Sequence, residues 1–501
     1  MKTKRLVVVV LVISFWLAMA GWLVFREAYP GLLQDAETGY RALFSKGLLV
    51  ADDWMKVSFQ NRRIGYSHTT VDVNEADPVA QYRLNNLTLL QLNLMGSRQR
   101  VSATTEATVD ALYNLQTFSF IISAAGYSAV IEGRRTRGPV FAVTIRGAGS
   151  VQHLNVTIPD DAVLYSPMTE MTLRNLAPGK QMTLRTFNPL TLAAQNVAIR
   201  SLRKESILSL GKKVEATVLS ATLEGMETQS WIDRDGRILR QETAFGWTIE
   251  ACLPQEALAD KGNAAADDLL TAMAVPVSGP VGGLIGARQV RLQLLGAPLL
   301  RENLESQRQT VLSVTGAVAE IEVRADRFPE HGLPPGAPDP AMAPFLASTP
   351  FLQANDRRMI AKAREITGQW TDSLAAAKAI YDWVYRTVEK KPTPSLPSAL
   401  DVLQQLEGDC NEHTYLFVGL ARAAGLPAKI RVGLTLHEGL FYYHAWPSVY
   451  VGRWLDMDPT LGQPAVDATH LSLFEGELQE QMKLMGVLGR LKIRVMEASQ
   501  P

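Results

Sequence analysis

The sequence predicts an α+β protein in which a β-rich part precedes a part that begins with helices and ends with strands. Between residues 51 and 270, short runs of imperfectly alternating polar and apolar residues are separated by turn residues, as in antiparallel strands. Beyond residue 351, apolar residues recur at every third or fourth position, as on amphipathic helices, and strand-like runs come later. An apolar run at the start predicts a transmembrane helix ahead of both parts.

The composition is that of a large globular protein. The chain has 501 residues, of which 47% are hydrophobic and 20% are charged, and this excludes global disorder. Lys and Arg together number 50, as do Asp and Glu, so the net charge is +0 and nucleic acid is not an expected partner. Two cysteines are too few for a disulfide scaffold or a four-cysteine zinc module. These values do not fix the oligomeric state.

The first element is a candidate membrane helix. Residues 6–25 contain no charge, and a run of this length suffices for a helix to cross a bilayer. Basic residues precede the run, which predicts a single-pass signal anchor over residues 1–26 with its N-terminus in the cytoplasm. The alternative is a cleaved signal peptide, because residues 18–20 have the small-x-small form of a cleavage site. In both cases the rest of the chain is expected to be exported.

Residues 51–270 are predicted to form one antiparallel sheet domain, either a curved sheet or an open barrel. Asp235-Gly236 between two strand-like runs is a hairpin signal, since glycine tolerates the positive φ of tight turns. Three further strand-like runs predict a small β-subdomain over residues 275–328. The β-rich domain carries no catalytic cluster, so we expect it to be a spacer or a docking surface for a lipid, glycan or protein ligand.

A proline-rich stretch separates these parts from the C-terminal domain. Residues 329–350 contain a dense series of prolines, which block helices and sheet ladders and favour an extended linker. Residues 351–501 form the predicted third domain. Ser398 and Asp401 resemble a capping pair for one of its helices, and Cys410 begins another helix, which ends where a glycine and a proline follow.

Three motifs in the C-terminal domain carry chemistry: GDC ending at Cys410, HAW beginning at His444 and DPT beginning at Asp458. A catalytic cysteine reacts as its thiolate, and the N-terminal end of a helix favours that anion. Cys410 lies at such a position. A neighbouring imidazole to accept the thiol proton, and a carboxylate to orient the imidazole, would complete a catalytic arrangement.

Strand geometry distinguishes the two carboxylates near the third motif. If residues 451–453 form a three-residue hairpin loop, Asp458 lies diagonally from His444 on the same face, about 7–8 Å away between backbones. Asp456 then lies two residues further along the strand, out of easy reach. A two-residue loop would put Asp458 on the opposite face. We therefore predict that Asp458 orients His444 and that Asp456 is a solvated strand residue.

The order of these motifs resembles the transglutaminase-like superfamily, and the resemblance extends over roughly residues 351–480. It implies a papain-like α+β catalytic domain in which Cys410 is the nucleophile, His444 the general base and acid, and Asp458 the residue that orients His444. Together with the N-terminal run, it implies a bacterial protein anchored in the inner membrane with a periplasmic catalytic domain. Many members carry an acidic residue soon after the HAW motif, whereas this chain continues with Pro447, which bears on substrate preference.

The implied reaction is acyl transfer on a protein or peptide amide. Cys410 would form a thioester, which water hydrolyses or an amine converts into an isopeptide bond, and hydrolysis is favoured in a bacterial setting. The backbone N–H of Cys410 is the expected oxyanion donor, and no metal or cofactor is expected. The alternative is a binding or assembly protein that uses the same domain as a recognition module without turnover.

Other residues have simpler interpretations. A disulfide between Cys252 and Cys410 would consume the nucleophile, so Cys252 is expected in the core. A metal site that joins His413 to Cys410 and other histidines would be irregular, so we expect His413 on a polar helix face. His470 is given no role. Four aromatic residues are open to two interpretations, as lining of a substrate cleft or as packing around strands: Tyr442, Tyr443, Trp446 and Trp454.

Overall fold

The computed structural model describes Tyr40 and residues 51–499, apart from gaps at 74–80, 95, 125–126, 148, 165–175, 224, 244–245, 260–267, 298, 335–338, 393–394 and 488. Of the described residues, 50% are in strands and 18% in helices. The chain is therefore mostly β, and the prediction of an α+β protein is wrong. The physical reason is that the helices only cover one small sheet near the C-terminus, whereas strands build nearly everything that precedes them.

The predicted membrane helix at residues 6–25 lies outside the described residues. Within the part of the chain that the structure describes, no helix is both long enough and apolar enough to cross a bilayer. The expectation of a signal anchor and of a single-pass protein of the inner membrane with a periplasmic catalytic domain is corrected to this extent: no helix of the described residues supports it.

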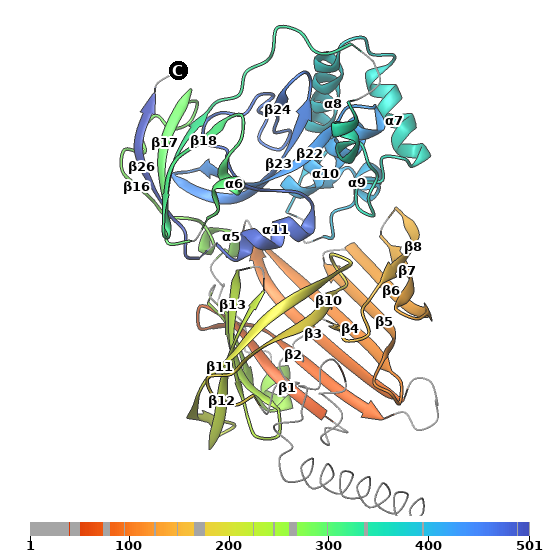
Figure 1. The fold of residues 1–501 in the computed structure, drawn as a ribbon, viewed down its shortest axis with the longest axis vertical. Helices are drawn as coiled ribbons and strands as arrows, with labels where there is room; N and C mark the ends of the chain where they lie inside the picture. Colours follow the sequence, from red (N-terminus) through yellow and green to blue (C-terminus); the bar gives the residue numbers. More distant parts are fainter. Residues whose placement is uncertain are drawn as a thin grey trace, which may run out of the picture.

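A single large sheet occupies residues 51–251 (Figure 1). Its strands are antiparallel to their neighbours except at one end, where β9 is parallel to β10. In sheet order the strands are β8 (Val151–Thr157), β7 (Val140–Arg146), β6 (Tyr127–Arg137), β5 (Leu115–Ala124), β4 (Ser97–Val109), β3 (Tyr82–Leu94), β2 (Arg62–Val73), β1 (Ala51–Phe59), β15 (Trp247–Ala251), β14 (Ile238–Thr243), β13 (Met226–Ile232), β12 (Lys212–Leu223), β11 (Ala193–Ser209), β10 (Gln181–Asn188) and β9 (Val163–Leu164).

The large sheet is strongly curved, so that its two halves share one core. In Figure 1 the yellow strands β10 and β11 pass in front of the orange strands. Phe118 on β5 and Phe187 on β10 belong to opposite halves of the sheet, yet their ring centroids are 5.4 Å apart and both side chains are buried. Such an edge-on aromatic pair stabilises the closure beyond the area that it buries. Where the sequence predicts either a curved sheet or an open barrel, the described residues form one curved, almost wholly antiparallel sheet.

A second, smaller sheet draws on distant parts of the chain. Its strands, in order, are β16 (Val277–Ser278), β26 (Lys492–Ser499), β17 (Gln289–Leu295), β19 (Val318–Arg324) and β18 (Gln309–Thr315). The C-terminal strand β26 thus pairs with β17, a contact that the sequence did not predict. Short helices flank this region: α4 (Pro254–Leu258), α5 (Leu269–Ala272), α6 (Arg301–Leu304) and the 3₁₀ helix η2 (Pro340–Phe345) within the predicted linker.

The C-terminal domain packs four helices around a small sheet. The helices are α7 (Arg357–Thr367), α8 (Ser373–Thr387), α9 (Ala399–Gln405) and α10 (Cys410–Ala423), and α11 (Leu478–Met485) follows the sheet. The sheet has the order β24 (Trp454–Asp456), β23 (Leu440–Tyr450), β22 (Ala428–His437) and β25 (Leu471–Glu475), and β20 (Glu389–Lys390) pairs with β21 (Glu407–Gly408).

Helix α10 is the centre of this domain. It is buried on all sides, as expected of a helix surrounded by other elements rather than lying on a surface. Gly419 allows its close approach to the neighbouring helices, since a Cβ there would lie 2.8 Å from the Cβ of Ala399. The position of Cys410, the first residue of α10, is therefore fixed by core packing.

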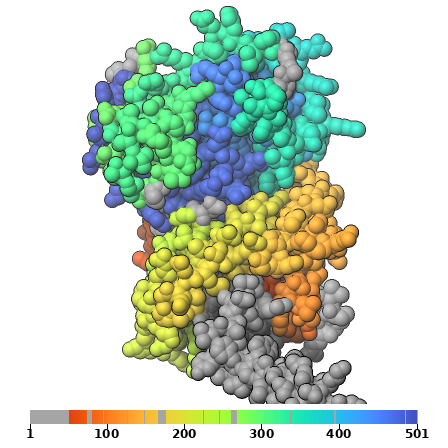
Figure 2. Space-filling model, in the orientation of Figure 1, coloured from red at the N-terminus to blue at the C-terminus, as the bar shows by residue number. Residues whose placement is uncertain are grey.

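The large sheet and the C-terminal domain are in direct contact (Figure 2). The buried carboxylate of Asp401 on α9 accepts hydrogen bonds of 2.9 Å from the N–H of Gly149 and from the hydroxyl of Ser150, which lie between β7 and β8. Ser398 takes the N-cap position of α9, as the sequence predicts, and its side chain hydrogen-bonds to Asp401, but it makes no capping hydrogen bond to the helix backbone. Asp401 serves mainly to join the two domains.

Substitution of one glycine tests the packing of the small sheet in the C-terminal domain. Gly433 on β22 lies opposite His444, and a Cβ at this position would lie 1.9 Å from the carbonyl oxygen of Leu471 on β25. Gly433→Ala must push β25 away, so we expect the free energy of unfolding to fall by about 1–3 kcal/mol in chemical denaturation. At Gly282 a Cβ meets nothing within 4 Å, so Gly282→Ala should change it by less than about 0.5 kcal/mol. Equal effects of the two substitutions would contradict this packing.

Candidate active site

The helix that carries Cys410 begins with a complete capping box. Asp409 precedes the helix and accepts the N–H of Asn411 at 2.9 Å, while the Glu412 side chain accepts the N–H of Asp409 at 2.9 Å. Gly408 has φ 155, and a Cβ there would lie 2.2 Å from the Cβ of Glu412, so glycine is required. The GDC motif thus ends in a cysteine whose backbone N–H has no partner within the helix.

The sulfur of Cys410 lies against β23. The backbone N–H of Ala445 points to it, and the Thr414 hydroxyl, one helical turn further on, donates to the Ala445 carbonyl at 3.0 Å. Burial raises the pKa of the Cys410 thiol well above its usual value, and the neighbouring Asp409 carboxylate raises it further. The surroundings therefore favour a protonated thiol, in contrast to the thiolate expected from the helix N-terminus alone. Such a cysteine needs a base during its reaction.

His444 and Asp458 are brought together as the hairpin argument predicted. Residues 448–450 of β23 pair with residues 454–456 of β24 in the expected register. The Nε2 atom of His444 lies 2.7 Å from Oδ2 of Asp458, and both side chains are buried. Because a carboxylate only accepts, Nε2 carries the proton and Nδ1 remains available as the basic nitrogen. His444 directly precedes Ala445, whose N–H points to Cys410.

Asp458 is fully buried, and each of its two carboxylate oxygens accepts two hydrogen bonds. Oδ1 accepts the backbone N–H groups of Thr460 at 2.8 Å and Leu461 at 3.0 Å. Oδ2 faces Nε2 of His444 and, at 2.9 Å, Nε2 of His470. Burial alone would raise the pKa of Asp458, but the two histidines outweigh it and hold the pKa far below its usual range. The carboxylate is therefore a permanent anion.

His470 is a residue that the sequence analysis missed. It lies just before β25, and its second nitrogen, Nδ1, is 3.4 Å from the carboxylate of Asp467. Burial lowers the pKa of His470, but hydrogen bonds and charges of Asp458 and Asp467 reverse the effect and raise it. No local pattern in the sequence marks this residue, because the contact joins segments that only the fold brings together.

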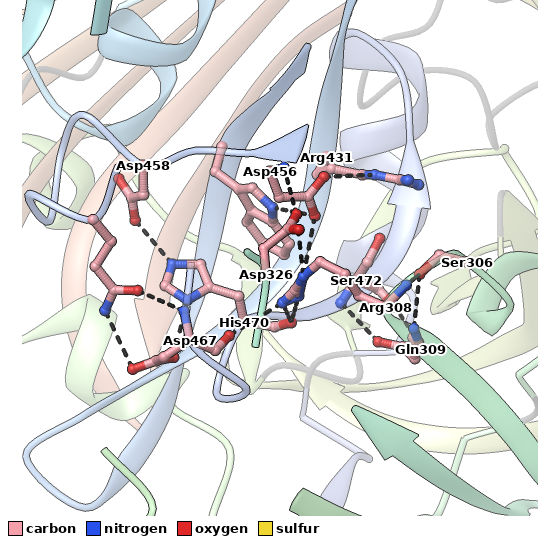
Figure 3. A network of polar contacts seen from close by, with 12 residues as sticks. Ser306, Arg308, Gln309, Asp326, Arg431, Asp456, Asp458, Asp467, His470 and Ser472 are labelled. Atoms are coloured by element: carbon pink, nitrogen blue, oxygen red, sulfur yellow. Dashed lines mark hydrogen bonds and ion pairs between the residues drawn. The ribbon is translucent and has the colours of Figure 1, made fainter. Parts of the chain in front are cut away.

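Arg308 connects His470 to the smaller sheet (Figure 3). Its guanidinium donates to the backbone carbonyl of His470, at 3.1 Å from Nη2, and to that of Asp467, also at 3.1 Å. The same group lies 3.8 Å from the carboxylate of Asp456 and 3.9 Å from that of Asp326. Arg308 therefore holds the backbone of His470 in place from outside the catalytic motifs.

Asp456 differs from its prediction as a solvated strand residue. It is buried, it accepts the indole N–H of Trp446 at 3.1 Å, and it lies 3.8 Å from both Arg308 and Arg431 (Figure 3). Burial would raise the pKa of Asp456, but the two guanidinium groups lower it. The negative charge of Asp456 compensates the charges of the two buried arginines. None of its described contacts is with His444.

The remaining sequence candidates occupy distinct environments. Cys252 is buried and both cysteines are free, so the disulfide alternative is wrong. His413, predicted to lie on a polar face of the helix, is fully buried, and its Nδ1 lies 2.7 Å from the carbonyl of Asp409. Of the four aromatic residues, Tyr442 and Tyr443 line a cavity. The other two are packing residues: Trp446 is buried and Trp454 packs on Phe345.

Among the described residues, His444, Asp458 and His470 could converge on a metal ion, since their ligand atoms lie within 4.8 Å of one another. This set differs from the irregular one considered in the sequence. Both Nε2 atoms already donate to the same oxygen of Asp458, and His470 also faces Asp467. A metal would have to displace these protons, so the donors suit hydrogen bonding better than coordination.

Replacement of Arg308 tests the network behind His470. Arg308→Leu leaves each of the buried carboxylates of Asp326 and Asp456 with one arginine, Arg453 and Arg431 respectively. We expect the free energy of unfolding in chemical denaturation to fall by about 3 kcal/mol. The control is Arg324→Leu on β19, where the side chain is 60% exposed and a change below about 0.5 kcal/mol is expected. A loss no larger than the control's would argue against the network.

The charge of His470 predicts a pH-dependent stability. Asp458 and Asp467 outweigh burial and raise the pKa of His470 in the folded protein. The stabilisation of the folded protein by protonated His470 is therefore complete below about pH 6.5 and is lost as the pH rises through the raised pKa. We expect the Tm of the wild type to fall more steeply above about pH 6.5 than that of His470→Gln, in thermal unfolding at a series of pH values. Parallel Tm profiles would show that His470 is neutral in the folded state.

Comparison with known proteins identifies the domain that contains this site. A family model described as the transglutaminase-like superfamily matches residues 360–459, whereas no curated protein matches the chain. A solved structure of a candidate cysteine protease from Cytophaga hutchinsonii is 18% identical, with a TM-score of 0.30, over 44% of this chain and 82% of that one. The periplasmic domain of TgpA from Pseudomonas aeruginosa is 17% identical, with a TM-score of 0.26, over 42% of this chain and 77% of that one.

The two structural likenesses are too weak to carry an argument, but the family match includes Cys410, His444 and Asp458. The resemblance inferred from the sequence is confirmed for this part of the chain: residues 360–459 form a domain of the transglutaminase-like superfamily.

Proposed function

We propose that this chain is an enzyme that transfers an acyl group from a protein or peptide amide through a thioester on Cys410. The observation that carries the proposal is the buried 2.7 Å hydrogen bond between His444 and Asp458, beside a helix whose first residue is a cysteine. The transglutaminase-like domain supports cysteine-dependent acyl transfer or hydrolysis in general. The roles of the individual residues rest on the geometry.

The first half of the reaction forms the thioester. Nδ1 of His444 takes the thiol proton of Cys410 as the sulfur attacks the carbonyl carbon, which matters because the environment holds the thiol pKa high. The oxyanion of the tetrahedral intermediate accepts the backbone N–H of Cys410 at the N-terminal end of α10. His444 then returns the proton to the amide nitrogen, the C–N bond breaks, and the amine leaves. Asp458 keeps Nε2 of His444 protonated throughout.

The second half of the reaction releases the acyl group. Nδ1 of His444 takes a proton from the acceptor, which adds to the thioester carbonyl, and the C–S bond breaks with return of the proton to the Cys410 sulfur. Water as acceptor gives a carboxylic acid, and an amine gives a new amide. The neutral His444 needed in this step is regenerated when the first amine leaves.

A second candidate is a binding or assembly protein that uses this domain for recognition without turnover. One observation favours it: burial and the Asp409 carboxylate raise the pKa of the Cys410 thiol, as in an unreactive cysteine. Against it stand the two buried histidines and the fully saturated carboxylate of Asp458, because such a polar cluster is costly to bury and is not needed for recognition alone.

Alkylation by iodoacetamide separates the two candidates. The full-length protein is labelled over a range of pH, with mass spectrometry to locate the label, in the wild type, in His444→Ala and in Cys410→Ala. We expect labelling of Cys410 at neutral pH to slow by at least about tenfold in His444→Ala, because no base then offsets the raised thiol pKa. The rate should recover at higher pH.

Cys252 provides an internal reference, since it is free and buried and should resist labelling until the protein unfolds. Circular dichroism checks that each variant is folded. If Cys410 reacts at the same rate with and without the His444 imidazole, or does not react in the folded wild type, the enzyme proposal fails and the recognition module remains.

A further inference from the structure

A cavity of about 290 Å³ opens beside the N-terminal end of α10. Most of its wall is apolar and is made by two short segments that the sequence analysis did not connect with the site. The side chains concerned come from α5 with the residue that follows it, and from α11: Leu270, Met273, Leu478 and Met482.

The polar edge of the cavity adjoins the candidate catalytic residues. Asn411, which follows Cys410, and Tyr443, which precedes His444, both line it. The hydroxyl of Tyr443 lies 3.1 Å from Oδ1 of Asn411, which fixes this edge. A substrate whose carbonyl lies at the Cys410 sulfur therefore has a neighbouring group at the mouth of the cavity.

The cavity is held open at the contact between the two domains. In Figure 1, α5 and α11 lie between the large sheet and the C-terminal domain. Val275, just after α5, forms a bridge with Phe441 on β23, and Met482 on α11 contacts Asn188 on β10. Pockets at domain contacts are frequent ligand sites, because separate elements supply opposite walls.

The residues that line the cavity indicate which kind of ligand it can bind. None of the described residues that line the cavity is charged, and an isolated charge brought into such surroundings is strongly disfavoured. An apolar cavity of about 150 Å³ already accepts benzene, so this larger one has room for an aromatic or leucine-sized side chain. Three of its polar side chains, those of Asn411, Tyr443 and Gln481, are hydrogen-bonded to one another at the edge.

We propose that this cavity binds a large apolar side chain of the substrate close to the carbonyl that Cys410 attacks. The inference rests on the proposed function and narrows its substrate class to peptides with leucine-, methionine- or phenylalanine-like side chains beside the reacting amide. Acidic side chains at this position are excluded by the lining.

Matched irreversible probes test the proposal on the full-length protein. Dileucyl, diglycyl and diaspartyl chloromethyl ketones alkylate an active-site cysteine with loss of chloride, and iodoacetamide gives the reactivity of the thiol without use of the cavity. We expect the dileucyl probe to label Cys410 at least about tenfold faster than the other two, after each rate is divided by the iodoacetamide rate of the same protein.

A pair of leucine substitutions locates the preference. Leu270→Asp puts a charge on the cavity wall at a side chain that is 37% exposed, so the protein should fold, and the dileucyl preference should fall to less than about threefold. Leu258→Asp on α4, which is 58% exposed and does not line the cavity, should retain the full preference.

The outcomes distinguish this inference from the proposed function. Equal labelling by the three probes, or a dileucyl preference that survives Leu270→Asp, overturns the cavity assignment while a reactive Cys410 leaves the proposed function standing. A Cys410 that iodoacetamide does not label in the folded protein removes both.

Discussion

The arrangement of the C-terminal domain depends on the burial of one carboxylate. Asp458 lies wholly inside the protein, where an unpaired charge is very costly, so its oxygens must be satisfied by four donors at once. Two donors are backbone N–H groups of the turn that follows it, and two are the imidazoles of His444 and His470. These imidazoles come from different segments. Their hydrogen bonds to Asp458 therefore fix the positions of β23 and of the start of β25.

The second histidine explains why the smaller sheet is needed near the site. His470 is held by its backbone carbonyl as well as by its ring, and the donor to the carbonyl is Arg308, just before β18. Arg308 is itself buried and must be balanced by Asp326 and Asp456. A network of buried polar groups thus extends from the smaller sheet through His470 and Asp458 to His444, and β26 from the C-terminal part of the chain belongs to that sheet. The same network therefore stabilises the domain and holds His470 in place.

The sequence predicted what is encoded locally and missed what only the fold brings together. The helix start at Cys410, the hairpin register and the pairing of His444 with Asp458 follow from caps, turn length and strand period. The contacts of His470 and Arg308 join residues far apart in the chain and leave no periodic signal. The helical patterns suggest an α+β protein, but the few helices around one small sheet contain far fewer residues than the large sheet that precedes them.

The central claim is that Cys410 carries an acyl group during the reaction, with His444 held by Asp458 as its base. Intact-mass spectrometry after brief exposure to an activated acyl ester tests this directly, since a thioester is cleaved by hydroxylamine whereas an acylated lysine is not. The account predicts a hydroxylamine-labile adduct on Cys410 that is absent in Cys410→Ala and forms at least about tenfold more slowly in Asp458→Asn. Stable adducts on lysines alone, or equal rates with and without the Asp458 carboxylate, would contradict it.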